Sequence, residues 1–472
     1  MAGSRAVDDL FEVPPLAKEL GARFREPGHQ LYLVGGTVRD ALLKRGPEKD
    51  LDFATDAGPE EIIHVLRGWA DSKRLVGVRF GTVGARKDGV ELEITTFREE
   101  VYPEDSRHPR VTFARDIHTD LSRRDFTINA MAVRLPDGEF LDPFRGLYDL
   151  AHRRLRTPLE PEVSFGDDPL RMLRAARFVS TLGMEPVQEL VEAIGRMHER
   201  LRIVSVERIQ DEFSKLLLGE HVDRALSLLV ETGLADVFLP ELAALRLEQD
   251  PVHRHKDVFH HTLAVVKKCE PDLVLRLAAL LHDIGKPKTR AITPEGVQFH
   301  HHEVVGARMA EERLRALRYP ERVVRDVRKL VELHLRFHTY GAGWTDGAVR
   351  RYVRDAAELL DRLNALTRAD TTTRNPQRAR ALARLQDELE ERIARLAEQE
   401  NLESIKPPLD GHQIMEHLGV GPGPVVGAAR DHLLELRMDR GPISEEEARR
   451  LLDEWAREQG LSPEEKDPGT GG

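Results

Sequence analysis

The stretch LYLVGGTVRDALLKRGPEKDLDF, residues 31–53, constrains the fold of this chain more than any other segment. It begins with an apolar run typical of a buried strand, which stops at a Gly-Gly pair. A short helical pattern follows from Val38 to about Lys44, and a second strand is predicted to carry Asp50 and Asp52. Because residues two apart on a strand point to the same face, these two carboxylates are expected to converge.

The residue types in this stretch suit a site that binds both a metal and a phosphate. Asp50 and Asp52 repel each other unless a divalent cation lies between them, and hard oxygen ligands favour Mg²⁺. Gly36 has no side chain to block a phosphate and lies at a predicted helix N-terminus, where backbone N–H groups can face an anion. Arg39 adds a positive charge nearby. Each feature alone also fits a tight turn or a solvated strand end, but their combination indicates metal-dependent nucleotidyl transfer.

Length and composition bound the class of protein. The 472 residues suffice for three or four domains, and 32% charged with only 5% aromatic residues favours a largely helical, soluble protein. Cys269 is the only cysteine, which excludes intrachain disulfides. With no signal-peptide pattern and no apolar run of membrane-spanning length, we expect a cytoplasmic protein without a membrane partner. The net charge of −11 argues against a nucleic-acid partner unless basic residues cluster, as they do from Arg171 to Arg177.

The combination of GGTVRD with KDLDF about ten residues later closely resembles the nucleotidyltransferase head of the bacterial (class II) CCA-adding enzyme and poly(A) polymerase family, in the DNA polymerase β superfamily. This resemblance implies an α+β fold, with a small polymerase-β-like head built on a mixed sheet and an extended all-α body behind it. It also implies a third carboxylate on the strand beside Asp50 and Asp52, for which Glu93 is the candidate. Glu91 and Glu93 fit the polar face of a half-exposed strand equally well. The aperiodic segment from Arg98 to Ala114 fits a mobile loop over the site or ordinary disorder.

Two further strings resemble motifs of the same family. LSRRDFTINAMAVR, residues 121–134, resembles the RRDFTINA motif, and LDPFRGLYDL, residues 141–150, resembles DPFxGxxDL. Arg124 offers a guanidinium fork for phosphate oxygens, and Asp125 an acceptor for ribose hydroxyls, which would select ribonucleotides. The alternative is a surface Arg-Asp pair that caps a helix.

The string GDDPLRMLRAARF predicts a helix with polar residues three apart along one face, namely Asp168, Arg171, Arg174 and Arg177. Such a stripe is often a salt-bridged surface. Here it resembles the family's nucleobase-recognition motif, usually Glu-Asp-x-x-Arg, with Asp167 in place of the Glu. The string SVERIQDEFSKLL further on resembles the helix-anchoring motif, whose braces would be Glu207, Arg208, Glu212 and Lys215.

Hydrogen-bond chemistry explains how one Asp-Arg pair can select two bases. Cytosine and adenine both present an exocyclic amino donor beside a ring-nitrogen acceptor, so Asp168 can accept while Arg171 donates. Guanine and uracil present the reverse order and would leave buried groups unpaired, at a cost on the order of 1–3 kcal/mol each. The pair therefore predicts selection of C and A without a template.

A second metal-binding pattern occupies roughly residues 250–375. Imidazoles and carboxylates on consecutive helices can hold one or two divalent metals with positions open for phosphate. The order resembles the H…HD…D pattern of the HD superfamily of metal-dependent phosphohydrolases, carried here by His261, His282, Asp283 and Asp370. His302 and His334 match the extra histidines of its longer variants. The resemblance implies a metal-competent domain, either hydrolytic or kept as a tRNA-binding body, and leaves the metal's identity open.

These observations divide the chain into a nucleotidyltransferase head (1–150), a helical neck with the base-recognition helix (151–245), an HD metal-binding domain (246–375) and a helical tRNA-binding tail (376–472). The resemblance implies template-independent addition of CCA, or part of it, to tRNA 3′ ends from CTP and ATP, with Mg²⁺ held by Asp50 and Asp52. One alternative is a poly(A) polymerase, or an enzyme that adds only A or only CC. Another alternative is that phosphohydrolysis by the HD domain is the principal activity of the protein. A silent tRNA-binding protein is disfavoured by the intact Asp pair.

Overall fold

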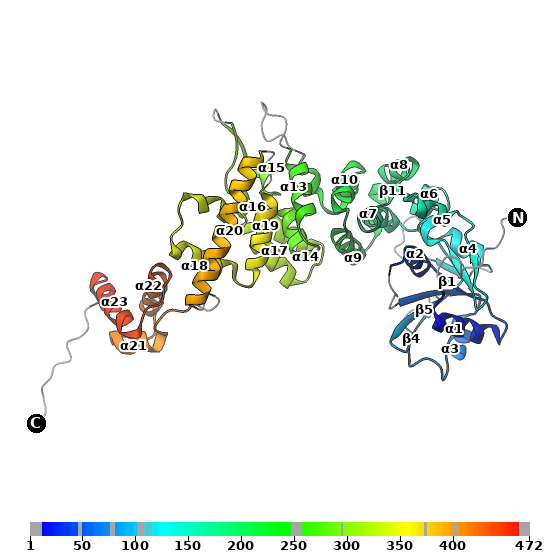
Figure 1. Cartoon of the computed structure of the whole chain (residues 1–472), viewed down its shortest axis with the longest axis horizontal. Helices are drawn as coiled ribbons and strands as arrows, with labels where there is room; N and C mark the ends of the chain where they lie inside the picture. The colour runs from blue at the N-terminus through cyan, green and yellow to red at the C-terminus, as the bar shows by residue number, and fades with distance from the viewer. Residues whose placement is uncertain are drawn as a thin grey trace, which may run out of the picture. The chain divides into compact units, whose positions relative to one another are not determined.

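The computed structural model describes residues 12–45, 50–75, 81–101, 110–113, 116–246, 257–293, 296–371, 375–400, 402 and 405–461. The chain forms two compact units (Figure 1). The first unit contains Met1–Leu247 with the short pieces Pro271–Leu273 and Arg313–Tyr319, and the second contains the remaining residues. A sheet near the N-terminus and helices after it confirm the predicted α+β fold.

The sheet of the first unit has seven strands in the order β3-β4-β5-β2-β1-β8-β9. The sheet is mixed, as predicted. Strand β2 runs parallel to β5, and all other neighbouring strands of the sheet are antiparallel. The fully buried strand β1 lies between β2 and β8, which explains its unbroken apolar sequence. The strands are β1 (Leu31–Val34), β2 (Asp50–Thr55), β3 (Ser72–Arg74), β4 (Thr82–Lys87), β5 (Val90–Thr96), β8 (Ala132–Leu135) and β9 (Glu139–Leu141).

Short helices connect these strands: α1 (Pro15–Arg25), α2 (Gly36–Leu42), α3 (Pro59–Val65), α4 (Ile117–Ser122), the 3₁₀ turn η3 (Thr127–Asn129) and α5 (Gly146–Ala151). The segment from Arg98 to Ala114, which the sequence left without structure, contains an antiparallel pair, β6 (Arg98–Val101) with β7 (Arg110–Phe113). Pairing between two strands stabilises such a segment, and the periodicity of the sequence does not reveal this pairing. Residues 102–109 and 114–115 lie outside the described part of the chain.

Helices form the rest of the first unit, with one short parallel strand pair, β10 (Arg154–Leu155) and β11 (Glu185–Pro186). The helices are α6 (Pro161–Asp167), α7 (Leu170–Leu182), α8 (Gln188–Met197), η4 (His198–Ile203), α9 (Val206–Leu217), α10 (Val222–Glu231), α11 (Leu234–Phe238) and α12 (Pro240–Ala243). Helix α7 packs against α9 and α10, and its Phe178 and the Phe213 of α9 are buried.

The prediction that Asp168 shares a helix face with the arginines after it is wrong. Asp168 has an extended backbone at the C-terminal end of α6, and α7 begins only at Leu170. Pro169 accounts for the break, because a proline disfavours the helical conformation of the residue before it. Asp168 therefore lies in the bend between two helices, with Arg171 in the first turn of the second.

The second unit is helical apart from a β-hairpin, β12 (Arg290–Thr293) with β13 (Gly296–Phe299). Its helices are α13 (Val258–Lys268), α14 (Leu273–Leu281), α15 (Lys286–Thr289), α16 (His302–Ala316), α17 (Glu321–Leu333), η5 (Arg336–Ala342), α18 (Asp346–Ala356), η6 (Ala357–Leu359), α19 (Leu360–Asp370), α20 (Pro376–Gln399), α21 (Gly411–Leu418), α22 (Pro424–Arg440) and α23 (Glu445–Glu458). None of the described helices combines the length and the apolar character that crossing a membrane requires.

The last three helices have a hydrophobic core of their own, to which Ile414, Leu433, Leu452 and Trp455 contribute. A buried ion-pair network joins them to α18. The Glu400 carboxylate accepts from Arg350 Nε at 2.8 Å and from Arg437 Nη1 at 2.6 Å. Both Glu400 and Arg350 are almost completely buried, so each charge depends on the other for compensation.

Candidate nucleotidyl-transfer site and metal centre

Four carboxylates lie on one face of the sheet where β2 pairs with β5. The parallel register places Asp52 next to Glu93 and Asp50 next to Glu91, so these side chains share one face of the sheet. The Asp52 side chain is accessible to solvent, yet the protein around it partly desolvates it, which raises its pKa, and repulsion from Glu93 and Asp50 raises the pKa further. A bound divalent cation relieves such repulsion, so the donor set fits the predicted metal.

Asp52 and Glu93 form one wall of a cavity of about 310 Å³ within the first unit, whereas Asp50 and Glu91 are not among the residues that line it. The opposite walls come from the segment after α4 and from the helices α7 and α9. The cavity brings together seven of the predicted site residues, namely Asp52, Glu93, Arg124, Asp125, Asp168, Arg171 and Arg174. Asp120, Arg123 and Arg208 also line it.

The Gly-Gly pair allows a guanidinium to approach the backbone closely. Gly35 has a positive φ of 70°, and a Cβ atom placed there would lie 2.9 Å from Arg124 Nη1 and 3.7 Å from Asp52 Oδ2. Arg124 also donates to Asp120 at 3.0 Å, which fixes the guanidinium beside the carboxylates. Gly36 begins α2, so backbone N–H groups at this helix end remain available to an anion.

Arg39, predicted to hold a phosphate, connects elements in this structure. It donates to Asp40 and, at 2.8 Å, to Asn129 Oδ1. Its guanidinium lies 5.3 Å from the ring centroid of Phe178, a buried residue of α7. Arg39 therefore ties α2 to η3 and α7, and its predicted phosphate contact stays a prediction.

The buried carboxylate of Asp125 already accepts hydrogen bonds from neighbouring protein groups. It accepts from Arg174 Nη2 at 2.6 Å and Nε at 2.9 Å, and from Asn129 Nδ2 at 2.9 Å. Burial would raise its pKa, but Arg174 outweighs that effect and holds the pKa of Asp125 well below its usual range. Arg174 also binds Glu212, and Arg177 donates to Glu212 at 2.6 Å. The arginine pair thus anchors α7 to α9 and to the RRDF loop.

The two members of the base-reading pair each contact protein groups as well as the cavity. Asp168 accepts from Arg208 Nη2 at 2.8 Å and from the Leu170 backbone N–H at 3.1 Å. Arg171 donates from Nη1 to Ser164 Oγ at 2.9 Å and from Nη2 to the Arg123 carbonyl at 2.5 Å. Arg208 and Glu212 therefore act as the braces that the sequence predicted.

Arg123 and Ser164 are site residues that sequence reasoning missed. Arg123 donates to Asp167 at 3.3 Å, so the Asp that replaces the family's usual Glu has a partner within the site. Arg123 is adjacent to Arg124 in the RRDF string, and that adjacency was the available signal. Ser164 carries no such signal, because only the packing of α6 against α7 brings it to Arg171.

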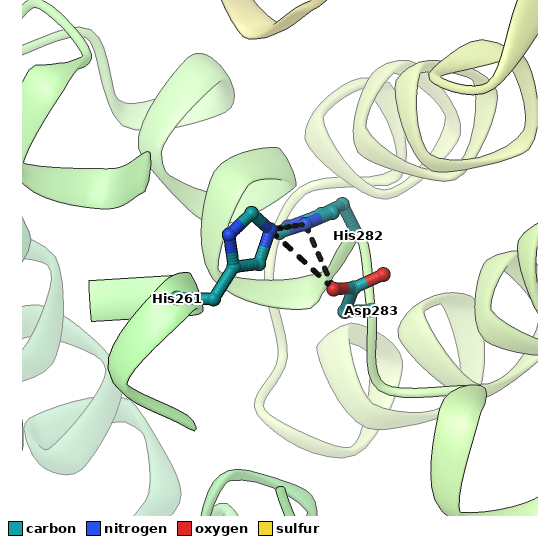
Figure 2. A group of neighbouring side chains, drawn as sticks. All are labelled: His261, His282 and Asp283. Carbon is teal, nitrogen blue, oxygen red and sulfur yellow. Dashed lines mark hydrogen bonds and ion pairs between the residues drawn. The ribbon is translucent and has the colours of Figure 1, made fainter. Parts of the chain in front are cut away.

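The HD residues of the second unit also converge (Figure 2). The three residues drawn in Figure 2 are His261 on α13 and the adjacent His282 and Asp283 after α14. One potential ligand atom from each lies within 4.8 Å of the other two. His261 Nε2 is 2.9 Å from Asp370 Oδ1, and His282 Nε2 is 3.2 Å from Asp283 Oδ2. Burial disfavours a charged His282, but Asp283 outweighs this effect and raises its pKa to about 10.

Asp283 is shared with a second group that contains His302 and His334. The Nδ1 atoms of His282, His302 and His334 lie 2.6–2.9 Å from the carbonyl oxygens of Ala279, Phe299 and Val331. A carbonyl that accepts from Nδ1 leaves the Nε2 lone pair for a metal. His334 Nε2 is buried without a hydrogen-bond partner among the described residues, and burial lowers its pKa to about 3. This orphaned nitrogen fits a metal ligand.

Two further residues lie at this centre: Lys286, which was not predicted, and His338, which belongs to the histidine pattern of residues 250–375 but was not assigned as a ligand. Lys286 Nζ lies 2.7 Å from Asp283 Oδ2, and His338 Nε2 lies 3.6 Å from Asp370 Oδ2. Lys286 comes from the GKP string after the HD pair, whereas His338 comes from η5, which packs near the centre only in the folded molecule.

Comparison with known proteins agrees with this arrangement. Three family models match: the poly A polymerase head domain (31–156), the probable RNA and SrmB-binding site of polymerase A (183–245) and the HD domain (258–398). The CCA-adding enzymes of Anoxybacillus flavithermus and Geobacillus sp. are 46% and 44% identical over 222 and 231 residues, which are 47% and 48% of this chain. These alignments cover 54% and 55% of the relatives, so the match spans about half of their length.

Solved structures extend the likeness along the chain. The Bacillus stearothermophilus CCA-adding enzyme in complex with CTP has a TM-score of 0.70 and 28% identity, and the match covers 95% of this chain and 99% of that one. The Thermotoga maritima CCA-adding enzyme complexed with tRNA has a TM-score of 0.60 at 19% identity over 96% of this chain and 99% of that one, which shows the shared fold.

The mixed sheet with its carboxylate cluster, the cavity facing α7 and the HD cluster define a nucleotidyltransferase head joined to a helical body with an HD domain. Families of both kinds generally use divalent metals. The chain thus combines the poly A polymerase head domain, the RNA-binding region of polymerase A and the HD domain, and it is similar to CCA-adding enzymes.

Proposed function

We propose that the protein adds C and A nucleotides to the 3′ end of tRNA from CTP and ATP, without a nucleic-acid template. One observation carries this proposal: a single cavity has Asp52 and Glu93 on one wall and Asp168 and Arg171 on another. The first pair suits the triphosphate end of a nucleotide, and the second suits the hydrogen-bonding edge of its base. The known relatives are CCA-adding enzymes, one of them solved with CTP.

The three carboxylates Asp50, Asp52 and Glu93 would hold Mg²⁺. When bound, Mg²⁺ lowers the pKa of the primer 3′-hydroxyl and offsets charge on the α-phosphate and the leaving pyrophosphate. Arg124 lies 3.0 Å from Asp120 and beside the Gly35 backbone, where its guanidinium can hold phosphate oxygens.

The ribose and base contacts follow from groups that the protein already positions. Asp125 accepts a ribose hydroxyl in exchange for one of its present donors, because Arg174, Asn129 and the Phe126 backbone N–H already fill the roughly four acceptor sites of a carboxylate. Asp168 accepts the amino group of cytosine or adenine while Arg208 holds its second oxygen. Arg171 donates to the ring nitrogen after exchanging one of its present protein contacts.

Sequencing of reaction products tests this function directly. Purified protein is incubated with a tRNA transcript that lacks its last three nucleotides, together with CTP, ATP or both. Complete CCA ends in the mixture are expected. Ends with only A, only CC or a run of A would assign the chain to the corresponding alternative within the family. A primer that stays unextended with Mg²⁺ present would refute the proposal.

A second activity, metal-dependent hydrolysis of phosphate esters by the HD domain, is favoured by the HD cluster. Asp283 belongs to both groups of metal-binding residues, and three imidazoles present their Nε2 atoms to it. Nucleotides or a tRNA 3′-phosphate are the substrates that suit such a centre. Release of phosphate from these compounds that depends on an added divalent metal would establish this activity.

A further inference from the structure

Three exposed arginines without ion pairs among the described residues flank, along the chain, a stacked Tyr-His pair at helix α5. Arg145 precedes the helix, and Arg153 and Arg154 follow it. Within the part of the chain that the structure describes, none of the three guanidiniums forms an ion pair. In a chain of net charge −11, in which several neighbouring arginines are paired with carboxylates, three such cations within one short stretch of the chain need a reason.

The aromatic part of this cluster is already ordered for stacking. The rings of Tyr148 and His152 lie 4.1 Å apart and nearly parallel, and the Arg145 guanidinium lies 4.7 Å from the Tyr148 ring. The Tyr148 side chain remains 41% exposed, although a tyrosine gains stability from burial. A planar ligand that joins this stack therefore finds the side chains arranged in advance.

Two of these arginines have an unusual backbone conformation. Arg145 has φ +62° and Arg153 has φ +53°, a region that favours glycine. Both positions keep an arginine at some conformational cost, on the order of 1 kcal/mol each. Strain of this kind is found at binding sites, where the side chain repays it.

We propose that this surface, formed by Arg145, Tyr148, His152, Arg153 and Arg154 and named the α5 patch, binds the tRNA primer away from its reacting end. The proposal rests on the proposed function for the choice of RNA. Guanidiniums without ion pairs bind phosphates, and a base stacks on the planar groups, a combination typical of RNA contact surfaces. An acidic protein would use the cations but has no need for the stack.

The α5 patch is also connected to the cavity. Asp149 of α5 accepts from Thr127 Oγ1 at 2.7 Å, and Thr127 follows the Asp125 that lines the cavity by two residues. Gly146 packs so closely on Thr127 that a Cβ atom there would overlap its carbonyl oxygen. RNA bound at the patch would therefore rest on the element that supports the RRDF loop.

The role of the arginines is tested by measuring how tRNA binding depends on salt. The full-length protein is titrated with a tRNA transcript that lacks its last three nucleotides, with no free nucleotide present. The variant Arg153→Gln/Arg154→Gln is compared with Arg196→Gln/Arg202→Gln, which removes the same charge from arginines of the same unit that are paired with Glu162 and Glu199. The patch variant should lower the slope of log K against log salt by about 1.5 to 2, and the control should not. Equal slopes would overturn the proposal.

Tyr148→Ala tests the stack separately. This variant should weaken tRNA binding by about 5- to 150-fold without changing the salt slope, because stacking on a base is not ionic. Binding of heparin, a polyanion without bases, should stay as in the unchanged protein. If Tyr148→Ala binds tRNA normally, or loses heparin and tRNA alike, the patch does not recognise RNA bases. The KM for CTP should not move in either variant.

The two proposals fail separately. If the variants show these binding effects but the protein never extends the primer, the α5 patch proposal stands and the proposal of nucleotide addition is refuted. If the protein adds CCA but its patch variants bind tRNA as well as the control variant does, only the α5 patch proposal is refuted.

Discussion

At the residue scale, the site is a set of charges that hold one another before any substrate enters. Asp125, Asp168 and Arg171 each have hydrogen-bond partners within the first unit. Such contacts fix the rotamers of the side chains, so that less conformational entropy is lost when a nucleotide binds. Substitutions in this network should therefore change selectivity as well as rate.

Removal of the Asp168 carboxylate should relax base selection. Asp168→Ala takes away the acceptor that rejects carbonyl-bearing bases, so UTP and GTP should gain relative to CTP and ATP. One buried mismatch is worth roughly 1–3 kcal/mol, or about 5- to 150-fold in relative kcat/KM. The measurement is kcat/KM for each nucleotide on one tRNA primer.

Arg171→Ala provides the contrast for that experiment. It should weaken all four nucleotides, because Arg171 also holds Ser164 and the Arg123 carbonyl. If Asp168→Ala keeps the discrimination of the unchanged protein, base selection resides outside this pair.

The carboxylate cluster gives a second prediction at the residue scale. Asp50→Ala, Asp52→Ala and Glu93→Ala should each reduce nucleotide addition to below about a hundredth, because metal ligation is lost while the fold and tRNA binding persist. Glu91→Ala is the matched control: Glu91 lies two residues earlier on the same strand but pairs with Arg74 at 2.7 Å. Equal losses in Glu91→Ala and Glu93→Ala would remove Glu93 from the metal site.

At the scale of elements, the sequence predicted the strand–turn–helix start and the two strands that carry the carboxylates. Periodicity and a Gly-Gly stop are local signals, and β1, α2 and β2 follow them. That β5 lies beside β2 came from family resemblance. The break at Pro169 and the β6–β7 pair were missed, because one depends on a proline effect that was not weighed and the other on cross-strand pairing.

The same limit applies to the sites. The sequence identified the charged residues of the base-reading region but not their partners, since Ser164 reaches Arg171 only through helix packing. In the HD domain, the H…HD…D order is readable along the chain. His338 belongs to the same histidine pattern, but its place 3.6 Å from Asp370 was not predicted, because it depends on the fold of η5.

The turn between β1 and α2 gives a prediction about an element. Gly35→Ala forces a side chain into a positive-φ position and toward the Arg124 guanidinium. Stability should fall by about 1 kcal/mol, and nucleotide addition should fall further because Arg124 is displaced. Gly28→Ala is the control, since Gly28 also has a positive φ, of 95°, but no atom near its Cβ position. Thermal unfolding with kcat/KM separates the effects: similar activity loss in both variants would contradict the role given to the turn.

At the scale of the whole molecule, the carboxylates Asp52 and Glu93 and the HD cluster belong to different compact units. His282→Ala with Asp283→Ala should remove any phosphohydrolase activity and spare nucleotide addition. The two activities are measured on one preparation, with circular dichroism as the check on folding. Loss of both in a folded variant would show that the units depend on each other.

The buried Glu400 has a consequence for anyone who shortens this protein. The sequence suggests a cut near residue 376, where the long charged helix begins, as the natural end of the HD domain. A chain ended there would lose Glu400 and Arg437, and also α20 and α22, which pack against α18 and cover Arg350. The face of α18 that carries Arg350 and Val349 would then lose its packing partners. A fragment meant to report on HD chemistry should therefore extend through α22, so that Arg350, Glu400 and Arg437 are retained together.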